Sequence, residues 1–196
     1  DVYKRQVYGF DKSNNSIKEA LEKNIIDSKV ESILDINSKD FVKKVDLIIV
    51  AVPPKQTLDV LNDLKDIWNT DVTITDTSSV KNHIKLNGAS NIVLSHPIAG
   101  SDQSGISAAN GDLFKNKKNV LCDPFNSKKG HFEKVDNFWK NALQMRTSSM
   151  SVSEHDLIFA MTSHLPHLVS YALIDSIRLS NLSLIHISEP TRLGFI

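Results

Sequence analysis

The sequence predicts a doubly wound α/β sheet, in which strands and helices alternate along the chain. Residues 45–52 (VDLIIVAV) are almost wholly apolar and rich in β-branched side chains, the pattern of a strand buried on both faces of a parallel sheet. Pro53 and Pro54 end this strand. Other short apolar segments are separated by helical patterns, and this spacing is typical of strands joined by right-handed crossovers.

The first expected element is a strand over residues 7–10 that ends in Asp11. Ser13 is a suitable helix cap, and a helix should follow to about Lys23. Helices and strands then alternate along the chain, so that each helix connects one strand to the next. The later helices are expected over residues 56–67, 80–86, 105–109 and 131–143, and the later strands over residues 45–52, 72–75, 92–95, 120–123 and 145–147.

A second kind of structure begins near Ser153. Apolar residues recur at helical spacing from there onward, which predicts one long helix and the entry to a helical second domain. Pro166 lies inside this helix and should kink it, because proline lacks a backbone donor and crowds the preceding turn. We therefore divide the chain into a sheet domain over residues 7–150 and the start of a helical domain over residues 151–181.

Charge and cysteine content narrow the function classes. Lysine plus arginine and aspartate plus glutamate each number 23, so no net field draws the protein to nucleic acid or to an anionic membrane. A small molecule is therefore a more suitable partner than nucleic acid or a membrane surface. The single cysteine, Cys122, excludes an internal disulfide framework and suits a reducing compartment such as the cytoplasm. No uninterrupted apolar run approaches the roughly 20 residues that span a bilayer, and no secretory signal begins the chain.

The two ends have an unusual relationship. Residues 1–6 can be encoded by a nucleotide stretch whose reverse complement encodes residues 182–187. Such an inverted repeat resembles adaptor read-through from a sequencing library, and residues 188–192 look like its continuation. We therefore expect residues 1–6 and 182–196 to be artefacts, and exclude them from fold reasoning. The alternative is a native tail that matches by codon coincidence.

Candidate binding residues follow the expected strands, because open α/β sheets bind ligands beyond the carboxyl ends of their strands. Asp11 stands where a dinucleotide-binding unit places the acid that binds the adenosine ribose; the alternative is a solvated turn aspartate. The glycine-rich phosphate loop that should precede this acid is absent from the sequence, and Gly9 cannot replace it. Val52 and Pro53 form a strand end whose backbone could pass close to a flat cofactor ring.

Two further segments could carry chemistry. Ser78 and Ser79 follow a strand and begin an expected helix, where free amides favour an anion or a polar ligand; ordinary helix capping is the alternative. His96 comes just beyond the strand over residues 92–95, and Gly100 leaves room for a ligand nearby. A histidine titrates near neutral pH and can take a hydroxyl proton, although a lone loop histidine is often incidental.

The remaining histidines lie on the expected long helix. His164 and His167 are three residues apart and share a helix face. We expect no metal site there, because no cysteine or well-spaced third ligand accompanies the pair. The triplet Glu154-His155-Asp156 is read as helix capping and first-turn charge.

The order and spacing of these segments resemble those of the prephenate dehydrogenase family, which includes arogenate and cyclohexadienyl dehydrogenases. The most specific combination is HPIAGS at residues 96–101 with QSG at residues 103–105, followed by SHLPH at residues 163–167. The similarity also covers residues 7–11, 49–54, 75–81, 113–114, 154–156 and 163–173.

The resemblance implies a Rossmann-like NAD-binding domain without its first strand and glycine-rich loop, followed by the first long helix of an all-α dimerisation domain. It implies NAD, rather than NADP, as cofactor. It further implies oxidative decarboxylation of prephenate or arogenate in tyrosine biosynthesis, by a homodimer. The arginine that binds the substrate carboxylate in this family has no equivalent here, since Arg178 does not match it. The resemblance therefore implies that this polypeptide by itself is inactive.

The resemblance also implies residue roles. His96 would accept the proton of the ring 4-hydroxyl, and Ser79 would hydrogen-bond that hydroxyl and His96. Substrate would be seated by Ser101 and His167, with His164 as a further helper. The residues that would contact NAD are Asp11, Val52 and Pro53. Ser78 departs from the glycine common in this motif, which puts the local backbone shape in question.

Two other readings remain open. A hydroxyacid-type or other nicotinamide-dependent oxidoreductase would share the strand order, but would normally place a lysine on the helix that links the domains, where this chain has histidines. A non-catalytic Rossmann-like binding domain would keep the fold without the chemistry. Prephenate and arogenate are not distinguished: Asp102 could favour the ammonium group of arogenate, or be a solvent-facing loop acid.

Overall fold

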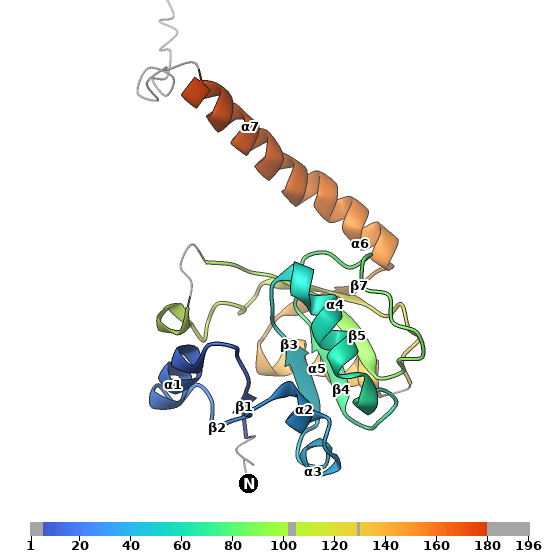
Figure 1. Cartoon of the computed structure of the whole chain (residues 1–196). Coiled ribbons are helices and arrows are strands. Elements are labelled where there is room, and N and C mark those ends of the chain that lie inside the picture. The colour runs from blue at the N-terminus through green and yellow to red at the C-terminus, as the bar shows by residue number, and fades with distance from the viewer. Residues whose placement is uncertain (1–5, 102–104, 129, 180–196) are drawn as a thin grey trace, which may run out of the picture. The chain divides into compact units, whose positions relative to one another are not determined.

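The computed structural model describes residues 6–101, 105–128 and 130–179 (Figure 1). The chain divides into two compact units, residues 1–155 and residues 156–196. Each unit is described separately below. Most of the segments expected to be artefacts, residues 1–5 and 182–196, lie outside the described residues.

The first unit is built on a five-stranded sheet with the order β3-β4-β5-β6-β7. Its strands are β3 (Leu47–Val50), β4 (Thr73–Asp76), β5 (Ile92–Ile98), β6 (Lys118–Cys122) and β7 (Arg146–Ser149). The pairs β3–β4, β4–β5 and β6–β7 are parallel, whereas β5 and β6 are antiparallel. The α/β fold class is therefore confirmed, but the sheet is mixed. The helix expected over residues 105–109 is only the 3₁₀ turn η2 (Ile106–Ala108), and an antiparallel neighbour needs no crossover helix.

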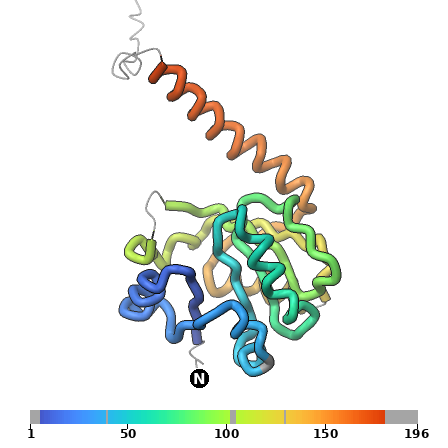
Figure 2. The backbone as a smooth tube through the Cα atoms, viewed as in Figure 1, coloured from blue at the N-terminus to red at the C-terminus, as the bar shows by residue number. Residues whose placement is uncertain are grey.

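A second, two-stranded sheet pairs β1 (Tyr8–Gly9) in parallel with β2 (Ser28–Lys29). Helix α1 (Asn14–Glu22) connects them, and the Ser13 hydroxyl accepts a hydrogen bond of 3.2 Å from the amide of Ser16, as its capping role predicts. The path of the chain then continues through two short helices that the sequence pattern did not indicate (Figure 2). These are α2 (Ile33–Ile36) and α3 (Lys39–Val42).

Two longer helices match their predicted positions. Helix α4 (Pro54–Asp63) begins with a proline at its first turn, where the missing amide costs no hydrogen bond, and is followed by the 3₁₀ turn η1 (Lys65–Ile67). Helix α5 (His131–Asn137) continues as a π-helical segment, η3 (Phe138–Ala142).

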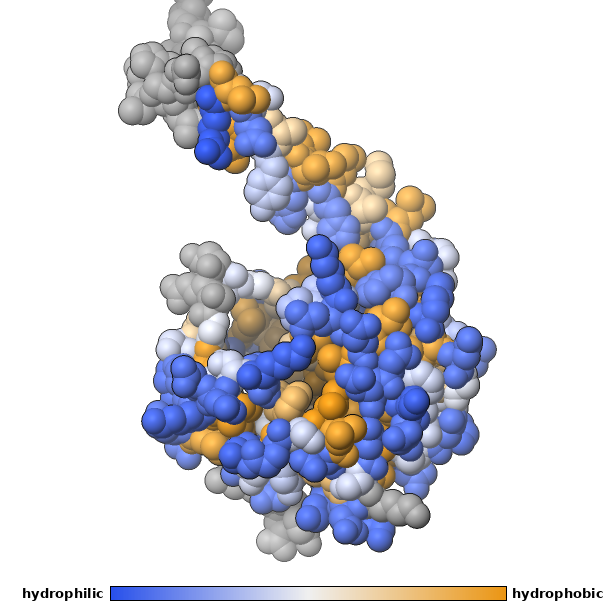
Figure 3. All heavy atoms as spheres, in the orientation of Figure 1, coloured by the Kyte–Doolittle hydropathy of each residue, from blue (hydrophilic) through white to orange (hydrophobic). Residues whose placement is uncertain are grey.

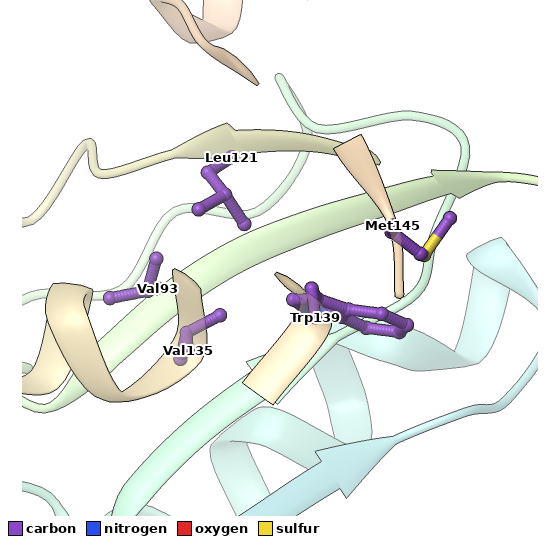
Figure 4. Packing of buried hydrophobic residues seen from close by; sticks show 5 residues of the cluster. All are labelled: Val93, Leu121, Val135, Trp139 and Met145. Carbon is purple, nitrogen blue, oxygen red and sulfur yellow. The ribbon is translucent and has the colours of Figure 1, made fainter. Parts of the chain in front are cut away.

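The main apolar cluster lies between this second helix and the sheet. Val135 and Trp139 are four residues apart, so they share one face of the helical segment. They pack with Val93 of β5, Leu121 of β6 and Met145 (Figure 4). All five side chains are at most 4% exposed. This cluster fixes the helical segment on one face of the sheet and leaves the other face to His96 and its partners.

Two sequence predictions for the first unit are wrong. No helix forms over residues 80–86, which contain turns. The Ser78 hydroxyl instead bonds both the carbonyl and the amide of Val80, a local arrangement that competes with helix formation. The strand β3 is not buried on both faces, since Ile49 is 39% exposed. Among the described residues β3 forms an edge of the five-stranded sheet, which explains this exposure.

The second unit consists, in its described part, of helix. Helix α6 (Val152–Phe159) begins in the first unit and is followed by the π-helical segment η4 (Ala160–His164) and by α7 (Leu165–Leu179). The kink expected at Pro166 stays a prediction. The backbone does depart from α-helical geometry just before the proline, in the π segment η4, where the proline ring crowds the preceding turn.

Many apolar side chains of this helix are exposed (Figure 3). They include Leu168, Val169, Tyr171, Leu173 and Leu179. By length and composition alone the whole helix, Val152–Leu179, could cross a membrane, although no single apolar run suggested this. An exposed apolar face of this size marks a surface that another layer of protein or lipid covers.

Acid sensitivity should depend on His131 at the start of α5. Its Nδ1 lies 2.7 Å from the Thr73 hydroxyl, and its pKa is lowered from 6.5, first by burial and then by the charge of Lys134. Below about pH 6.5 the unfolded chain takes up a proton that the folded chain refuses, so the free energy of unfolding should fall as the pH drops.

Urea unfolding at about pH 7.5 and pH 5.5 measures this effect. His131→Asn, which keeps an amide beside Thr73, should lose less stability between these two pH values than the wild type. His164→Asn, at an exposed position, controls for the loss of a histidine. An equal loss in wild type and His131→Asn would contradict the assignment.

Candidate active site

Two neighbouring strands of the larger sheet, β3 and β4, end at the same edge, and β5 continues past them. Val50 pairs with Asp76, so the carboxyl ends of β3 and β4 lie next to one another, whereas Thr75 pairs with Val93 near the start of β5, which runs on to Ile98. The amide of Thr77 also donates to the carbonyl of Val50 at 3.2 Å, which keeps the first two connecting loops together. Ligands of open α/β sheets bind at such an edge.

A buried ion pair lies beneath this edge. The ammonium group of Lys81 donates to both carboxylate oxygens of Asp76, at 2.8 and 2.6 Å, and both side chains are fully buried. The carboxylate also accepts the amides of Ser78 and Ser95, each at 3.0 Å. The charge on each side of this pair is thus compensated by hydrogen bonds as well as by its partner, which a buried ion pair requires.

The same ion pair reaches the strand that carries His96. Lys81 donates to the carbonyl of Ser95 at 2.5 Å. The Ser95 hydroxyl lies 2.6 Å from the hydroxyl of Thr75 and accepts the indole N–H of Trp139 at 3.0 Å. Side chains from β4, from the loop after β4 and from η3 therefore hold Ser95, and with it the backbone from which His96 projects.

His96 lies inside β5, opposite Val120 of β6, and not beyond the strand end as the sequence suggested. The strand continues to Ile98 because the antiparallel pairing with β6 provides partners for its backbone. Because side chains alternate along a strand, His96 projects to the face opposite Ser95. It is half-buried there.

A second histidine contacts it. The Nδ1 atom of His96 lies 2.9 Å from Nε2 of His155, and the rings meet edge to face with centroids 5.0 Å apart. His155 is fully buried. The sequence pattern missed this residue, because Glu154-His155-Asp156 has the composition of an ordinary first helical turn. No local signal marks a histidine whose partner is 59 positions away.

The capping interpretation of the same triplet is confirmed for its first member. Glu154 accepts the amide and the hydroxyl of Ser151, at 2.9 and 2.8 Å, and its own amide donates to that hydroxyl at 3.2 Å. These bonds to the charged form lower the pKa of Glu154, the bond from the backbone amide of Ser151 most of all. They also fix the start of α6, which carries His155.

The other predicted residues fall in three places. Ser79 is half-buried in the loop after β4, and half-buried Val52 and exposed Pro53 follow β3, so these three share the edge described above. Asp11 is exposed beyond β1, in the two-stranded sheet, and its carboxylate accepts the amide of Ser13 at 2.7 Å. Exposed Ser101 ends the described part of its loop, and Asp102 lies outside the described residues.

His164 and His167 lie in the second unit, and both are exposed. Across the parts of the chain that the structure describes, no three histidine, cysteine, aspartate or glutamate side chains gather in a way that could hold a metal ion. The expected helix start near Ser79 is also missing, so a helix dipole cannot favour an anion there. The hydroxyl and amides of that loop remain as its polar groups.

The sheet, its crossover helices and the polar edge define a Rossmann-like nucleotide-binding domain, followed by a separate helical unit. A family model described as "Prephenate dehydrogenase, nucleotide-binding domain" matches residues 2–144, and one described as "Prephenate dehydrogenase, dimerization domain" matches residues 151–188. The chain belongs to the prephenate dehydrogenase family.

Individual relatives agree with this family. The chain is 30% identical to a cyclohexadienyl dehydrogenase of Zymomonas mobilis, over 84% of this chain and 56% of that protein. It is also 30% identical to a prephenate dehydrogenase of Bacillus subtilis, over 87% of this chain and 46% of that protein. The chain thus spans about half the length of the curated relatives it matches.

A solved structure extends the comparison to the fold. The prephenate dehydrogenase of A. aeolicus, in complex with hydroxyphenyl propionate and NAD+, superposes with a TM-score of 0.77 at 30% identity. The match covers 96% of this chain and 63% of that structure.

Removing the charge of Asp76 should strongly destabilise the fold. In Asp76→Asn the Lys81 ammonium stays buried without a counter-charge, and breaking a buried pair in this way costs about 3–5 kcal/mol of unfolding free energy. Lys29→Met provides the control, because the pair Lys29–Glu31 has a similar 2.7 Å distance but is exposed. The control should cost about 1 kcal/mol or less. Denaturant unfolding compares the two, and equal losses would contradict the role given to Asp76.

Proposed function

We propose that the full-length protein is a cytoplasmic, NAD-dependent prephenate or arogenate dehydrogenase that serves tyrosine biosynthesis as a homodimer. The observation that carries this proposal is His96, held at the carboxyl edge of the sheet with its Nδ1 atom engaged by a buried histidine. A histidine in that position can take a hydroxyl proton through its other ring nitrogen.

The proposed reaction needs one base at the hydroxyl-bearing ring carbon. Nε2 of His96 accepts the proton of the 4-hydroxyl as the C–H bond at that carbon breaks. NAD, when bound, would supply the acceptor for the hydride that leaves this carbon. The ring carboxylate leaves as CO2, the electrons of its C–C bond complete the aromatic ring, and the ring oxygen regains a proton to give the phenol. Hydride departure leaves positive charge on the carbinol carbon, so a base that draws off the proton stabilises the transition state more than the ground state.

Other residues receive positioning roles in the proposal. Ser79 hydrogen-bonds the reacting hydroxyl and His96, which its place in the loop after β4 supports, since β4 and β5 are neighbours. Ser101 seats the substrate from the loop that follows β5. His167 of the helical unit also binds the substrate, with His164 as a further helper. Both side chains are exposed and therefore available to a ligand.

The cofactor roles fit the residues present. Asp11 places an exposed carboxylate beyond the end of β1, as binding of an adenosine ribose requires. Its negative charge opposes the 2′-phosphate of NADP. Val52 and Pro53 lie where β3 passes into α4, and Pro53 presents a short, rigid backbone step with φ −52° and ψ 144°. Such a step allows a flat ring to lie close to the chain.

The relatives support the cofactor, the substrate class and the dimer. The A. aeolicus enzyme was solved with NAD+ and a hydroxyphenyl compound. The dimerization-domain match covers residues 151–188, and the exposed apolar side chains of Val152–Leu179 would be covered by a partner subunit. That match also favours a protein partner over a membrane for this helix. Both named relatives are dehydrogenases of cyclohexadienyl or prephenate substrates.

Replacing His96 by Asn should lower kcat of the full-length protein by about 10²- to 10⁴-fold, because general-base catalysis is lost. Affinity for NAD should hardly change. His131→Asn is the matched control, since it makes the same substitution at the start of α5, beside Thr73 at the amino end of β4. Steady-state kinetics with prephenate and with arogenate measure the effect. Near wild-type kcat across about pH 6 to 9 in folded His96→Asn would disprove the base assignment, and His167 would be the next candidate.

Cofactor choice should depend on Asp11. The wild type should have a higher kcat/KM for NAD than for NADP, because two negative charges about 4 Å apart repel by about 1 kcal/mol in water and more near a protein surface. Asp11→Asn should reduce this preference by about tenfold or more. Asp59→Asn, an exposed acid on α4, should leave it unchanged. Equal use of both cofactors by the wild type would show that Asp11 lies away from the ribose.

A further inference from the structure

We infer that His155 is a positioning residue that holds His96 in the tautomer protonated at Nδ1, which leaves Nε2 of His96 as a proton acceptor. This inference rests on the proposed function for its consequence in catalysis. Its structural basis is the 2.9 Å contact between Nδ1 of His96 and Nε2 of His155.

A hydrogen bond between two imidazole nitrogens contains one proton, so its direction decides both tautomers. If His96 donates from Nδ1, its Nε2 carries a lone pair and can accept the substrate proton. If His155 donates instead, neutral His96 must carry its proton on Nε2 and cannot act as a base there. The proposed chemistry therefore requires His155 Nε2 to be the acceptor.

The surroundings of His155 suit an acceptor that stays neutral. Its side chain is fully buried, and burial disfavours the charged form of a histidine. A neutral ring can orient a neighbouring imidazole without placing a negative charge beside it, unlike the carboxylate that orients histidine in many hydrolases. When His96 gains a proton, the bond becomes charge-assisted and therefore stronger.

Both rings are attached to well-anchored backbone. His155 follows the Ser151–Glu154 capping bonds, its amide donates to the Ser151 carbonyl at 2.9 Å, and the amide of Met150 donates to Leu121 of β6 at 3.1 Å. His96 follows Ser95, which the ion pair and Trp139 hold. The two rings therefore meet with little freedom to separate, which a positioning role demands.

The tautomer can be observed directly in this chain. In long-range ¹H–¹⁵N spectra of a histidine, the two ring nitrogens give different shifts according to which one carries the proton. The His96 signals are assigned by their absence in His96→Gln. His83 serves as an internal reference, because its Nε2 lies 3.1 Å from the carbonyl of Pro54 and a carbonyl can only accept. We expect His96 to be protonated at Nδ1 and His83 at Nε2.

Two variants of His155 distinguish the effect of its acceptor atom from the effect of its ring volume. His155→Gln offers an amide oxygen near the position of Nε2 and should keep His96 protonated at Nδ1. His155→Phe fills a similar volume without an acceptor and should shift His96 toward protonation at Nε2. In the full-length protein, His155→Phe should lower kcat by about 10- to 100-fold, the usual cost of losing the group that orients a functional histidine. KM should change little, and Gln should restore most of the rate.

The outcomes distinguish this inference from the proposed function. A wild-type His96 protonated at Nε2 overturns the inference whether or not any variant folds. Protonation at Nδ1 in wild type and in folded His155→Phe alike overturns it too. Protonation at Nδ1 that is lost in His155→Phe and kept in His155→Gln supports it. If that pattern holds but the full-length protein turns over neither prephenate nor arogenate, the positioning role stands and the proposed function fails.

Discussion

The buried carboxylate of Asp76 holds the other parts of this site in place. It accepts hydrogen bonds from Lys81 and from the amides of Ser78 and Ser95, all inside the protein. A buried charge is costly unless it is compensated in this way, so the segments that carry these donors must fold together. The loop after β4 and the middle of β5 are thereby held at one edge of the sheet, where the candidate chemistry takes place.

The rest of the site follows from that constraint. Ser95 is held by Lys81, Thr75 and Trp139 on one face of β5, so His96 must project from the other face. On that face it meets His155, which enters from a helix start fixed by Ser151 and Glu154. The ion pair of Asp76 and Lys81 therefore fixes β5, and β5 fixes the position of His96. In the inferred arrangement His155 then selects the tautomer of His96.

The antiparallel pairing of β5 with β6 also restricts the position of His96. It extends β5 through His96 to Ile98, so the candidate base lies on a strand and not on a loop. A side chain on a strand has less freedom than one on a loop, which benefits a group that must meet a substrate hydroxyl in one orientation. The apolar helix Val152–Leu179 has the opposite character: many of its apolar side chains are exposed, and a partner subunit would cover them in the proposed homodimer.

The sequence by itself determined the α/β class, the cap at Ser13, most strands and the identity of His96 and Ser79 as candidates, because these depend on periodicity, local capping and motif order along the chain. Only the tertiary structure revealed the direction of β6, the turn in place of a helix after Ser79, and the contact of His155 with His96. Two of these depend on partners far apart in the sequence, namely the β5–β6 pairing and the contact between two histidines 59 positions apart. The turn depends on the bonds of Ser78 with Val80 and on the burial of Lys81, which also donates to Ser95, 14 positions away. Local propensity carries no information about such contacts, since they form only when the chain is folded.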